Sequence, residues 1–193
     1  MNIFNMLLTT PLTDECVEKL EAGEIVYLTG IISTVRDKAH ERALRLGKFP
    51  IDLKNGVIFH SGPIVKKEKD EWVIIAIGPT TSSRMNSLEP EFIERFNIRA
   101  VIGKGGMNEG VMKSMRENRS VYLSMTGGCA ASIAEMVKEV RGVYWLDLGI
   151  PEAIWVLRVE KFGPLIVSID AKGNSLYEEI DKRVQENLKG ISE

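Results

Sequence analysis

The sequence predicts a single α/β domain in which a mixed β-sheet is flanked by helices. Apolar runs of strand length recur along the chain between segments with the spacing of amphipathic helices. Several of these strands pass into the next helix through glycine-rich turns. The 193 residues suit one domain and are enough to bury a core, so we expect the domain to span residues 1–193.

The strands are predicted from apolar runs bounded by glycine, proline or charged turns. The run 24–35 is rich in β-branched residues and contains Gly30, which predicts a bulge or a close backbone approach. The runs 57–65 and 72–77 flank a segment of mixed charge and predict a hairpin with a solvated tip, in which 72–77 is a buried strand. The other predicted strands are 8–12, 99–102, 121–125, 143–149, 153–159 and 163–170.

The helices are predicted from capping residues and apolar spacing. Thr13 and Asn108 are preferred N-cap residues, and Pro90 is tolerated in a first helical turn. A helix at 36–46 stops at Gly47. Its predicted inner stripe consists of Ala39, Ala43 and Leu46. The other predicted helices are 13–20, 89–96, 108–116, 130–140 and 176–188.

The composition excludes several classes of function. The net charge of −2 gives no global attraction to nucleic acid or to an anionic membrane. No apolar run approaches the roughly 20 residues of a membrane span. We therefore expect neither nucleic acid nor a membrane as a partner. The first eight residues lack the basic start of a secretory signal, so a cytoplasmic protein is the expectation.

The chain is poorly supplied with metal ligands, and we predict that it holds no metal by itself. Its two cysteines, Cys16 and Cys129, are too few for a four-ligand zinc site or an iron–sulfur cluster, and both are interpreted as packing residues. Cys129 also stands at a predicted helix start, a position that favours reactive thiols. His40 and His60 lie 20 residues apart without a metal-ligand spacing, and His40 is interpreted as a surface or capping side chain.

A ligand is expected where strands pass into helices, at 29–36, 78–84, 103–108 and 126–130. In α/β sheets such junctions gather at the carboxyl ends of the strands, where helix N-termini offer backbone N–H groups. Three of the four junctions carry a cation, and these cations are Arg36, Arg84 and Lys104. An arginine at a helix start opposes the helix dipole, which suggests that it is there for an anion.

Three cations and several helix N-termini at one edge suit an anion with two charged ends. Neither a phosphate-loop pattern nor a dinucleotide fingerprint is present, so a dicarboxylate fits better than a nucleotide. No pairing of Ser, Cys, His and Asp can be nominated for nucleophilic catalysis. An anion pocket without a strong base or a metal suggests half of an active site, completed by another chain.

Four motifs carry a family resemblance. They are Thr29-Gly30 followed by Arg36-Asp37-Lys38-Ala39-His40, then Gly78-Pro79-Thr80-Thr81-Ser82-Ser83-Arg84-Met85, Gly103-Lys104-Gly105-Gly106-Met107 and Glu152-Ala153-Ile154-Trp155. Together they resemble the β subunit of class I, iron–sulfur-dependent fumarate hydratase, to which the β subunit of L-tartrate dehydratase is similar. The likeness covers nearly the whole chain and implies a swivelling-type α/β domain.

The resemblance implies a hydro-lyase that is active only with a partner. In the family, an α part carries the cysteines of a 4Fe–4S cluster, whose open iron acts as a Lewis acid. We therefore expect an α2β2 hetero-oligomer in which this chain binds no cofactor alone. By motif, Arg36, Arg84 and Lys104 would bind the substrate carboxylates and Thr80 would be the catalytic base. The implied supporting residues are Asp37, His40, Gly78 and Gly105, with His40 orienting Arg36 or Asp37.

Three functions stay open on the sequence. The first is the reversible hydration of fumarate to L-malate with an α subunit. The second is the same chemistry on L-tartrate, which carries a hydroxyl group on both central carbons. The third is a non-catalytic domain that senses or holds a small anion.

Overall fold

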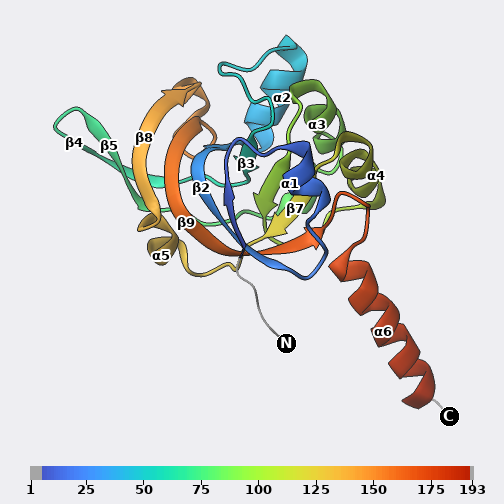
Figure 1. Ribbon diagram of the computed structural model, residues 1–193. Helices are drawn as coiled ribbons and strands as arrows, with labels where there is room; N and C mark the ends of the chain where they lie inside the picture. Colours follow the sequence, from blue (N-terminus) through green and yellow to red (C-terminus); the bar gives the residue numbers. More distant parts are fainter. Residues whose placement is uncertain (1–5, 192–193) are drawn as a thin grey trace.

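The computed structural model describes residues 6–191, which are built around a seven-stranded mixed sheet (Figure 1). The strands are β1 (Met6–Thr9), β2 (Ile25–Thr34), β3 (Val57–Phe59), β4 (Ile64–Glu68), β5 (Glu71–Ala76), β6 (Ala100–Gly103), β7 (Val121–Ser124), β8 (Val137–Tyr144) and β9 (Ile154–Ile169). The helices are α1 (Asp14–Glu18), α2 (Asp37–Leu46), α3 (Glu89–Phe96), α4 (Glu109–Asn118), α5 (Ala130–Ala134) and α6 (Leu176–Ile191), with 3-10 turns η1 (Ser82–Met85) and η2 (Leu146–Leu148). The predicted α/β class is confirmed.

The main sheet runs in the order β1-β2-β3-β6-β7-β9-β8. Its first five strands are parallel to one another, whereas β9 is antiparallel to β2, β7 and β8. Because β9 pairs with both β2 and β7, the strands β2, β3, β6, β7 and β9 form a closed ring of pairings. Figure 1 shows α2, α3 and α4 on one side of this ring.

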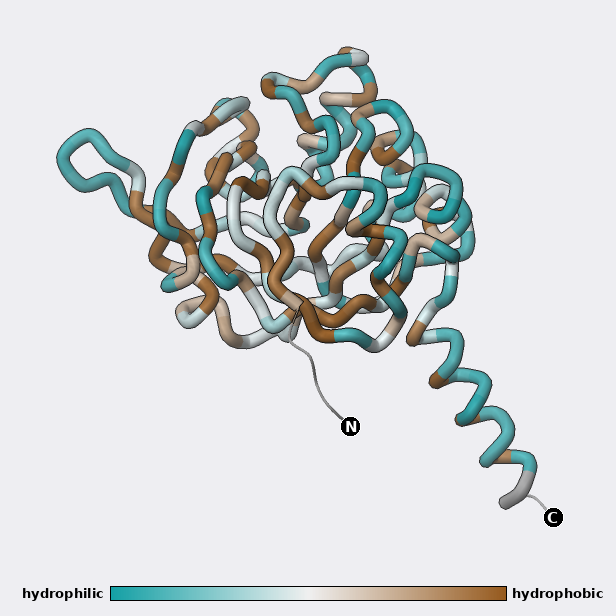
Figure 2. The backbone as a smooth tube through the Cα atoms, viewed as in Figure 1, coloured by the Kyte–Doolittle hydropathy of each residue, from teal (hydrophilic) through white to brown (hydrophobic). Residues whose placement is uncertain are grey.

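The central strands are buried on both faces, which explains why they are almost continuously apolar. In β3, Val57 and Phe59 pack inside the ring, while Ile58 points toward the helices. The same alternation recurs in β7, where Tyr122 joins the core beneath the helices. Figure 2 shows the hydrophobic stretches concentrated along these strands.

Several local predictions are confirmed in detail. The Thr13 side chain accepts a hydrogen bond from the Cys16 backbone N–H at 3.2 Å and thereby caps α1. Asn108 caps α4 in the same way, and Gly47 ends α2 in the left-handed conformation. Gly30 has a φ of +121°, and a Cβ there would lie 2.3 Å from Thr10 Oγ1, so the predicted close approach is real.

Several strand and helix predictions are wrong in their bounds. The predicted strand 143–149 ends at Tyr144, and Leu146–Leu148 form the 3-10 turn η2. The predicted helix 130–140 ends early, because Val137 and Val140 pair with the exposed edge of β9. The two strands predicted between 153 and 170 are one strand, since β2 runs alongside both halves and bridges the expected break. The run 57–65 splits, so that its first part lies in the main sheet and its end forms β4 of the hairpin.

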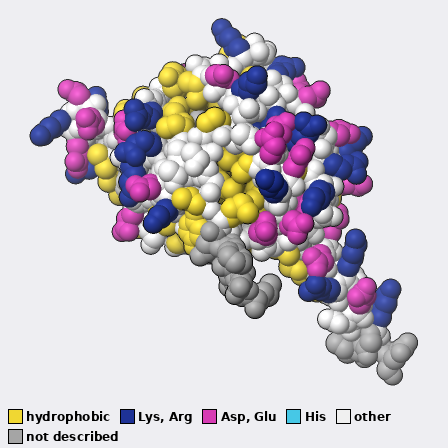
Figure 3. Space-filling model, viewed as in Figure 1, with side chains coloured by type: hydrophobic (Ala, Val, Ile, Leu, Met, Phe, Trp, Pro, Cys, Tyr) yellow, Lys and Arg dark blue, Asp and Glu magenta, His cyan; other side chains and the backbone are white. Residues whose placement is uncertain are grey.

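The hairpin β4–β5 is a separate two-stranded sheet that projects from the body, as Figure 1 shows. The run 72–77 was predicted to be buried, but Val73 and Ile75 are exposed because nothing among residues 6–191 covers that face of the hairpin. Charged side chains of both signs surround its tip and also line α6 (Figure 3). The mixed-charge tip therefore matches the prediction, and the buried strand does not.

The predicted inner face of α2 needs a correction. Ala39 and Ala43 are buried as expected, but Leu46 is 47% exposed. His40, interpreted above as a surface or capping residue, is completely buried. The reason is that α3 packs against α2, and the Phe92 ring lies 4.3 Å from the His40 ring, centroid to centroid.

Two further expectations concern a membrane-spanning segment and the N-terminal residues. Within residues 6–191, no helix is long and apolar enough to cross a membrane. The observation on the N-terminal segment concerns residues 1–8, of which 1–5 lie outside the described residues. The closing helix α6 leaves the body of the molecule in Figure 1, with Tyr177, Ile180 and Val184 partly exposed along it.

Candidate active site

The predicted junctions do meet at the carboxyl ends of the parallel strands, but one arrives by an unexpected route. The segment after β5 leaves the hairpin, not a strand of the main sheet. It is joined to the sheet by isolated bridges from Pro79 to Ser61 and from Thr81 to Lys104. In addition, the Thr80 backbone N–H donates to the carbonyl of His60 at 2.7 Å. The segment therefore lies between the continuations of β3 and β6.

Arg36 stands at the start of α2, as predicted, and it faces an anion supplied by this chain. Its Nη2 lies 3.2 Å from Glu152 Oε1, and its Nη1 donates to the Pro151 carbonyl at 3.4 Å. The other Glu152 oxygen accepts the backbone N–H of Lys38 at 3.1 Å. Glu152 thus supplies the cap that the α2 N-terminus would otherwise lack and orients Arg36 at the same time.

Arg84 and Asp37 form a bidentate pair across the two segments. Arg84 Nε and Nη2 donate to the two oxygens of Asp37 at 3.2 and 3.1 Å. Arg84 Nη2 also donates to Thr80 Oγ1 at 2.6 Å, and Arg36 Nε lies 4.0 Å from Asp37 Oδ2. Asp37 therefore joins both predicted arginines and the predicted base into one cluster, which we call the Asp37 cluster: Arg36, Asp37, Thr80 and Arg84.

Lys104 lies next to the Asp37 cluster through its backbone. Its N–H donates to the Thr80 carbonyl at 3.3 Å, and its own carbonyl accepts from Ser82 at 3.1 Å. The side chain is exposed and runs past Gly127, where a Cβ would lie 3.9 Å from Lys104 Nζ. Among residues 6–191, no hydrogen bond or ion pair engages that ammonium group.

The glycines of these turns have different physical roles. Gly105 has a φ of +76°, a conformation that favours glycine, whereas Gly78 has an ordinary φ and accepts a hydrogen bond from Ser61 Oγ at 2.6 Å. A Cβ on Gly103 would lie 1.9 Å from Ser82 Oγ. Gly103 therefore allows η1 to sit directly against the end of β6.

The charges of this edge leave a small excess of positive charge. Three cations, Arg36, Arg84 and Lys104, stand with two carboxylates, Asp37 and Glu152. The arginines are held in place by those carboxylates, yet Arg84 Nη1 donates to no residue between 6 and 191. Arg84 Nη1 and the Lys104 ammonium are thus available to bind an anion.

Beneath the edge lies a buried set of titratable side chains, which we call the Glu89 network: His40, His60, Ser82, Glu89 and Tyr122. Glu89 Oε2 lies 2.9 Å from His60 Nε2 and 3.4 Å from His40 Nε2. His60 Nδ1 lies 2.8 Å from Ser82 Oγ, which also accepts a hydrogen bond from the Tyr122 hydroxyl at 2.9 Å. All five side chains are fully buried.

Burial and mutual attraction set the protonation of this network. Burial alone would raise the pKa of the Glu89 carboxyl, but the imidazoles of His60 and His40 outweigh it and hold that pKa at about 2. Burial lowers the pKa of His60 and raises the pKa of Tyr122. Glu89 is therefore an ionised carboxylate without access to water at neutral pH.

The sequence did not reveal the Glu89 network. A glutamate in the first turn of a helix ordinarily faces solvent and complements the helix dipole, so Glu89 carried no sign of burial. His40 and His60 were judged by their separation along the chain, which says nothing about their distance in space. The one usable signal was His40 itself, which falls one turn after Arg36 on α2.

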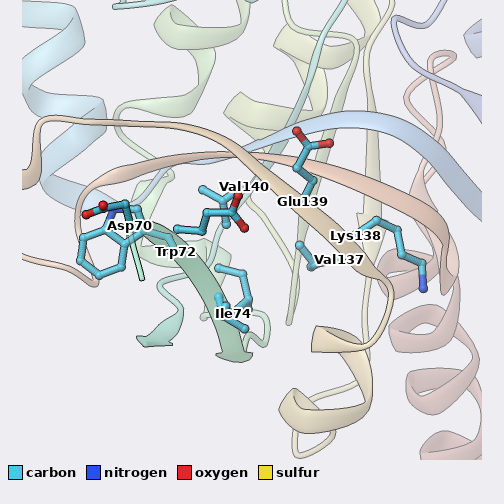
Figure 4. A pocket seen from close by; sticks show the side chains of 9 residues that line it. Asp70, Trp72, Ile74, Val137, Lys138, Glu139 and Val140 are labelled. Carbon is cyan, nitrogen blue, oxygen red and sulfur yellow. The ribbon is translucent and has the colours of Figure 1, made fainter. Parts of the chain in front are cut away.

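Neither cysteine belongs to the Asp37 cluster or to the Glu89 network, and a large cavity lies apart from both. Cys16 and Cys129 are free thiols, each half-buried and packed against the core. A cavity of about 590 Å³ lies between the hairpin and β8, lined by Trp72, Ile74, Val137, Val140 and their neighbours (Figure 4). Its lining includes no residue of the Asp37 cluster, so the predicted site is an open edge of the sheet and not this cavity.

Comparison with known proteins identifies the family. The model of the family described as "Fumarase C-terminus" matches residues 2–180. This chain belongs to that family. It is 52% identical over 182 residues to the putative L(+)-tartrate dehydratase subunit beta of Methanocaldococcus jannaschii, covering 92% of this chain and 93% of the relative.

Two further relatives of this fumarase C-terminus chain differ in length. The L(+)-tartrate dehydratase subunit beta of Escherichia coli is 43% identical over 188 residues, covering 97% of this chain and 94% of that subunit. The putative class I fumarate hydratase of Geobacillus stearothermophilus is 41% identical over 187 residues, covering 96% of this chain but 36% of that protein. The predicted resemblance is therefore confirmed at the level of the family.

Proposed function

We propose that this chain is the β subunit of an iron–sulfur hydro-lyase that interconverts a hydroxylated four-carbon dicarboxylate and its dehydration product. The observation that carries the proposal is the Asp37 cluster, in which two arginines and a threonine hydroxyl from separate segments meet beside Lys104. The relatives, which are named as dehydratase subunits and a hydratase, support the same reaction class.

The cations bind the two ends of the substrate. Arg84 retains Nη1 as a donor, and Lys104 retains its whole ammonium group, so both bind carboxylate oxygens without breaking a contact. Arg36 is held by Glu152 through Nη2, and its Nε is a buried nitrogen without a hydrogen-bond partner, 4.0 Å from Asp37 Oδ2. Arg84 and Lys104 therefore make the primary contacts in this proposal, and Arg36 adds long-range attraction.

Thr80 is the proposed base that moves the proton on the carbon next to a carboxylate. A threonine hydroxyl is a weak base, and its deprotonated form needs stabilisation. Arg84 Nη2 donates to Thr80 Oγ1, and a cationic donor at this distance favours negative charge on that oxygen. The same arginine thus both activates the base and holds the substrate beside it.

In this proposal, the 4Fe–4S cluster is bound by the partner subunit. This chain contains two cysteines, one near the start of α1 and one before α5, so it does not offer the cysteine set of a cluster. When bound in the partner, the cluster supplies Lewis acidity for the departing hydroxyl group. An α2β2 assembly, in which this chain closes over the partner's site as a swivelling domain, follows from the resemblance and is part of the proposal.

Two substrates are proposed within this class. Fumarate and L-malate are one pair, supported by the class I fumarate hydratase relative. L(+)-tartrate is the other, supported by the two relatives named as its dehydratase subunits. L-malate and L(+)-tartrate differ by one hydroxyl group on the second central carbon. A site suited to one of these acids is therefore expected to turn over the other more slowly.

Anaerobic reconstitution with the cognate α subunit tests the function. The complex is expected to hydrate fumarate or dehydrate L(+)-tartrate, whereas each subunit alone is inactive. The kcat/KM values for fumarate, L-malate and L(+)-tartrate, measured side by side, assign the substrate. Turnover by the isolated chain would contradict the proposal, and tight malate binding by the inactive isolated chain in calorimetry would favour a sensor instead.

A further inference from the structure

Glu89 lies between the two segments that build the Asp37 cluster. One segment is the start of α2, which carries Arg36 and Asp37, and the other is 80–84, which carries Thr80 and Arg84. A carboxylate with no solvent contact at this place is costly to desolvate, so the fold must hold it by specific partners. Both of its partners are histidines, and each histidine leads to one of the two segments.

The first connection runs through His60. Its Nε2 contacts Glu89, its Nδ1 contacts Ser82 Oγ in η1, and its carbonyl accepts the Thr80 backbone N–H. Ser82 lies two residues before Arg84, and Tyr122 holds the same hydroxyl from β7. A shift of the His60 ring therefore moves the backbone on which both Thr80 and Arg84 are mounted.

The second connection runs through His40. Its Nδ1 lies 3.0 Å from the Arg36 carbonyl oxygen, while its Nε2 faces Glu89. A carbonyl oxygen only accepts hydrogen bonds, so Nδ1 carries a proton. Its Nε2 lies 3.4 Å from Glu89 Oε2, a close contact without hydrogen-bond geometry. His40 thus places one ring nitrogen against Glu89 and hydrogen-bonds through the other to Arg36, the residue before α2.

The hydrogen-bond directions of the first connection are defined at Ser82. Tyr122 donates to Ser82 Oγ, which leaves the Ser82 proton for His60 Nδ1. His60 Nδ1 is then an acceptor, and its Nε2 lies 2.9 Å from Glu89 Oε2 as a close contact without hydrogen-bond geometry. Glu89 therefore contacts both imidazole rings, and each ring is hydrogen-bonded to one of the two segments.

We propose that Glu89 is a positioning residue: through His60 and His40 it sets the relative placement of Thr80 and Arg84 on one segment and Arg36 and Asp37 on the other. The proposal rests on the proposed function for its catalytic meaning. Its geometric content, that the charge of Glu89 fixes the Arg84–Asp37 pair, stands apart from any activity. The two parts are tested by separate measurements.

A rival arrangement uses the same three side chains. His40, His60 and Glu89 offer two imidazoles and a carboxylate whose nearest ligand atoms lie within 4.8 Å of one another, as a divalent metal requires. Among the described residues, no hydrogen bond joins Glu89 to either imidazole, so the distances alone do not choose between a proton and an ion. Metal analysis of the purified chain, without chelator treatment, decides between the two.

The principal test is Glu89→Gln, with Glu94→Gln on the exposed face of α3 as the matched control. Glutamine keeps the shape and removes the charge. In the reconstituted complex, Glu89→Gln is expected to lower kcat/KM about 100-fold, since a misplacement of about 1 Å costs that much, while the far-UV circular dichroism is unchanged. Wild-type kinetics for a folded Glu89→Gln complex would overturn the proposal.

A readout without activity separates this proposal from the proposed function. In the isolated ¹⁵N-labelled chain, the Nε–H signal of Arg84 reports its contact with Asp37. Glu89→Gln is expected to shift or broaden that signal, and Glu94→Gln leaves it in place. If the wild-type complex lacked hydro-lyase activity, the proposed function would fail while this measurement still tested the positioning. An unmoved Arg84 signal would overturn it.

A milder variant covers the case in which Glu89→Gln does not fold. Tyr122→Phe removes only the hydroxyl that holds Ser82 and leaves the aromatic ring in the core. It is expected to perturb the Arg84 signal in the same direction and to lower kcat/KM about 10-fold, a smaller loss than the charge change because one donor is removed. The proposal would be overturned if Tyr122→Phe changed neither the Arg84 signal nor the rate. It would also be overturned if the wild-type chain held one equivalent of zinc and Glu89→Gln abolished that binding.

Discussion

The Asp37 cluster and the Glu89 network differ in the solvent exposure of their charged side chains. In the Asp37 cluster, the side chains of Arg36, Asp37 and Arg84 are 22%, 32% and 45% exposed, whereas those of His40 and Glu89 are 0% exposed. Half-exposed ion pairs contribute at most about 1 kcal/mol each, because water screens them. Buried charges cost several kcal/mol to desolvate and are destabilising when a partner is lost. This difference suggests that the exposed Asp37 cluster, the outer region, binds a ligand. The buried Glu89 network, the inner region, would hold the residues of that cluster in position.

The sharpest test of the outer region removes the Thr80 hydroxyl group. Thr80→Val is nearly isosteric, so its unfolding free energy is expected to change by no more than about 1 kcal/mol. If the hydroxyl is the base, kcat falls about 10²- to 10⁴-fold. Thr80→Ser is the control, because it keeps a hydroxyl for Arg84 to contact. Steady-state kinetics of the two complexes decide, and similar kcat values would rule out Thr80 as the base.

The inner region is expected to respond to acid. The folded pKa of Glu89, about 2, lies below its ordinary value of 4.5, so its stabilising contribution is complete above pH 4.5 and is lost as the pH falls toward 2. The shift corresponds to about 3 kcal/mol of unfolding free energy. His60 acts in the same direction, because burial lowers its pKa below the ordinary value of 6.5 and acid therefore favours the unfolded state.

Urea unfolding of the isolated chain between pH 7 and pH 3 measures this effect. Stability is expected to fall with pH in the wild type and to fall less in Glu89→Gln below pH 4.5, since the variant lacks the titrating carboxylate. Equal slopes for the two chains would show that Glu89 does not carry the acid sensitivity. Other titratable groups would then have to account for the loss of stability in acid.

Arg84→Gln separates an effect on rate from an effect on stability. Loss of a charge-assisted carboxylate contact, worth about 1.5–3 kcal/mol, should lower kcat/KM about 10- to 150-fold. The unfolding free energy should change by about 1 kcal/mol or less, because the pair with Asp37 is half-exposed. Arg95→Gln is the control, since Arg95 pairs with Glu91 on the surface of α3. A loss of rate as large in the control would deny Arg84 a specific role.

Much of the outer region could be predicted because its signals are local. Arg36 stands at a helix start, Gly105 adopts a conformation that favours glycine, and Thr80 and Arg84 share one short motif. What the sequence could not show was their mutual arrangement. Glu152 was part of a recognised motif, yet its contact with Arg36 joins residues far apart in the chain. The pairing of Arg84 with Asp37 also depends on how the hairpin returns to the sheet.

The inner region escaped prediction for a different reason. Whether a helical side chain is buried depends on what packs against it, and α3 covers His40 only in the folded chain. Glu89 resembled an ordinary dipole partner in the first turn of a helix. The same dependence on neighbours explains the errors around β8, where Val137 and Val140 became strand residues because β9 offered an unpaired edge.

By itself, the amino-acid sequence determined the α/β class, the capped helices, the strands at the centre of the sheet and the identity of the cations at their ends. These features follow from residue types and spacings within a few positions, where local sterics and hydrogen bonding decide. Only the tertiary structure decided that Asp37 gathers the arginines and that Glu89 lies beneath them with two histidines. Those contacts join segments tens of residues apart, and their energies depend on burial, which exists only once the chain has folded.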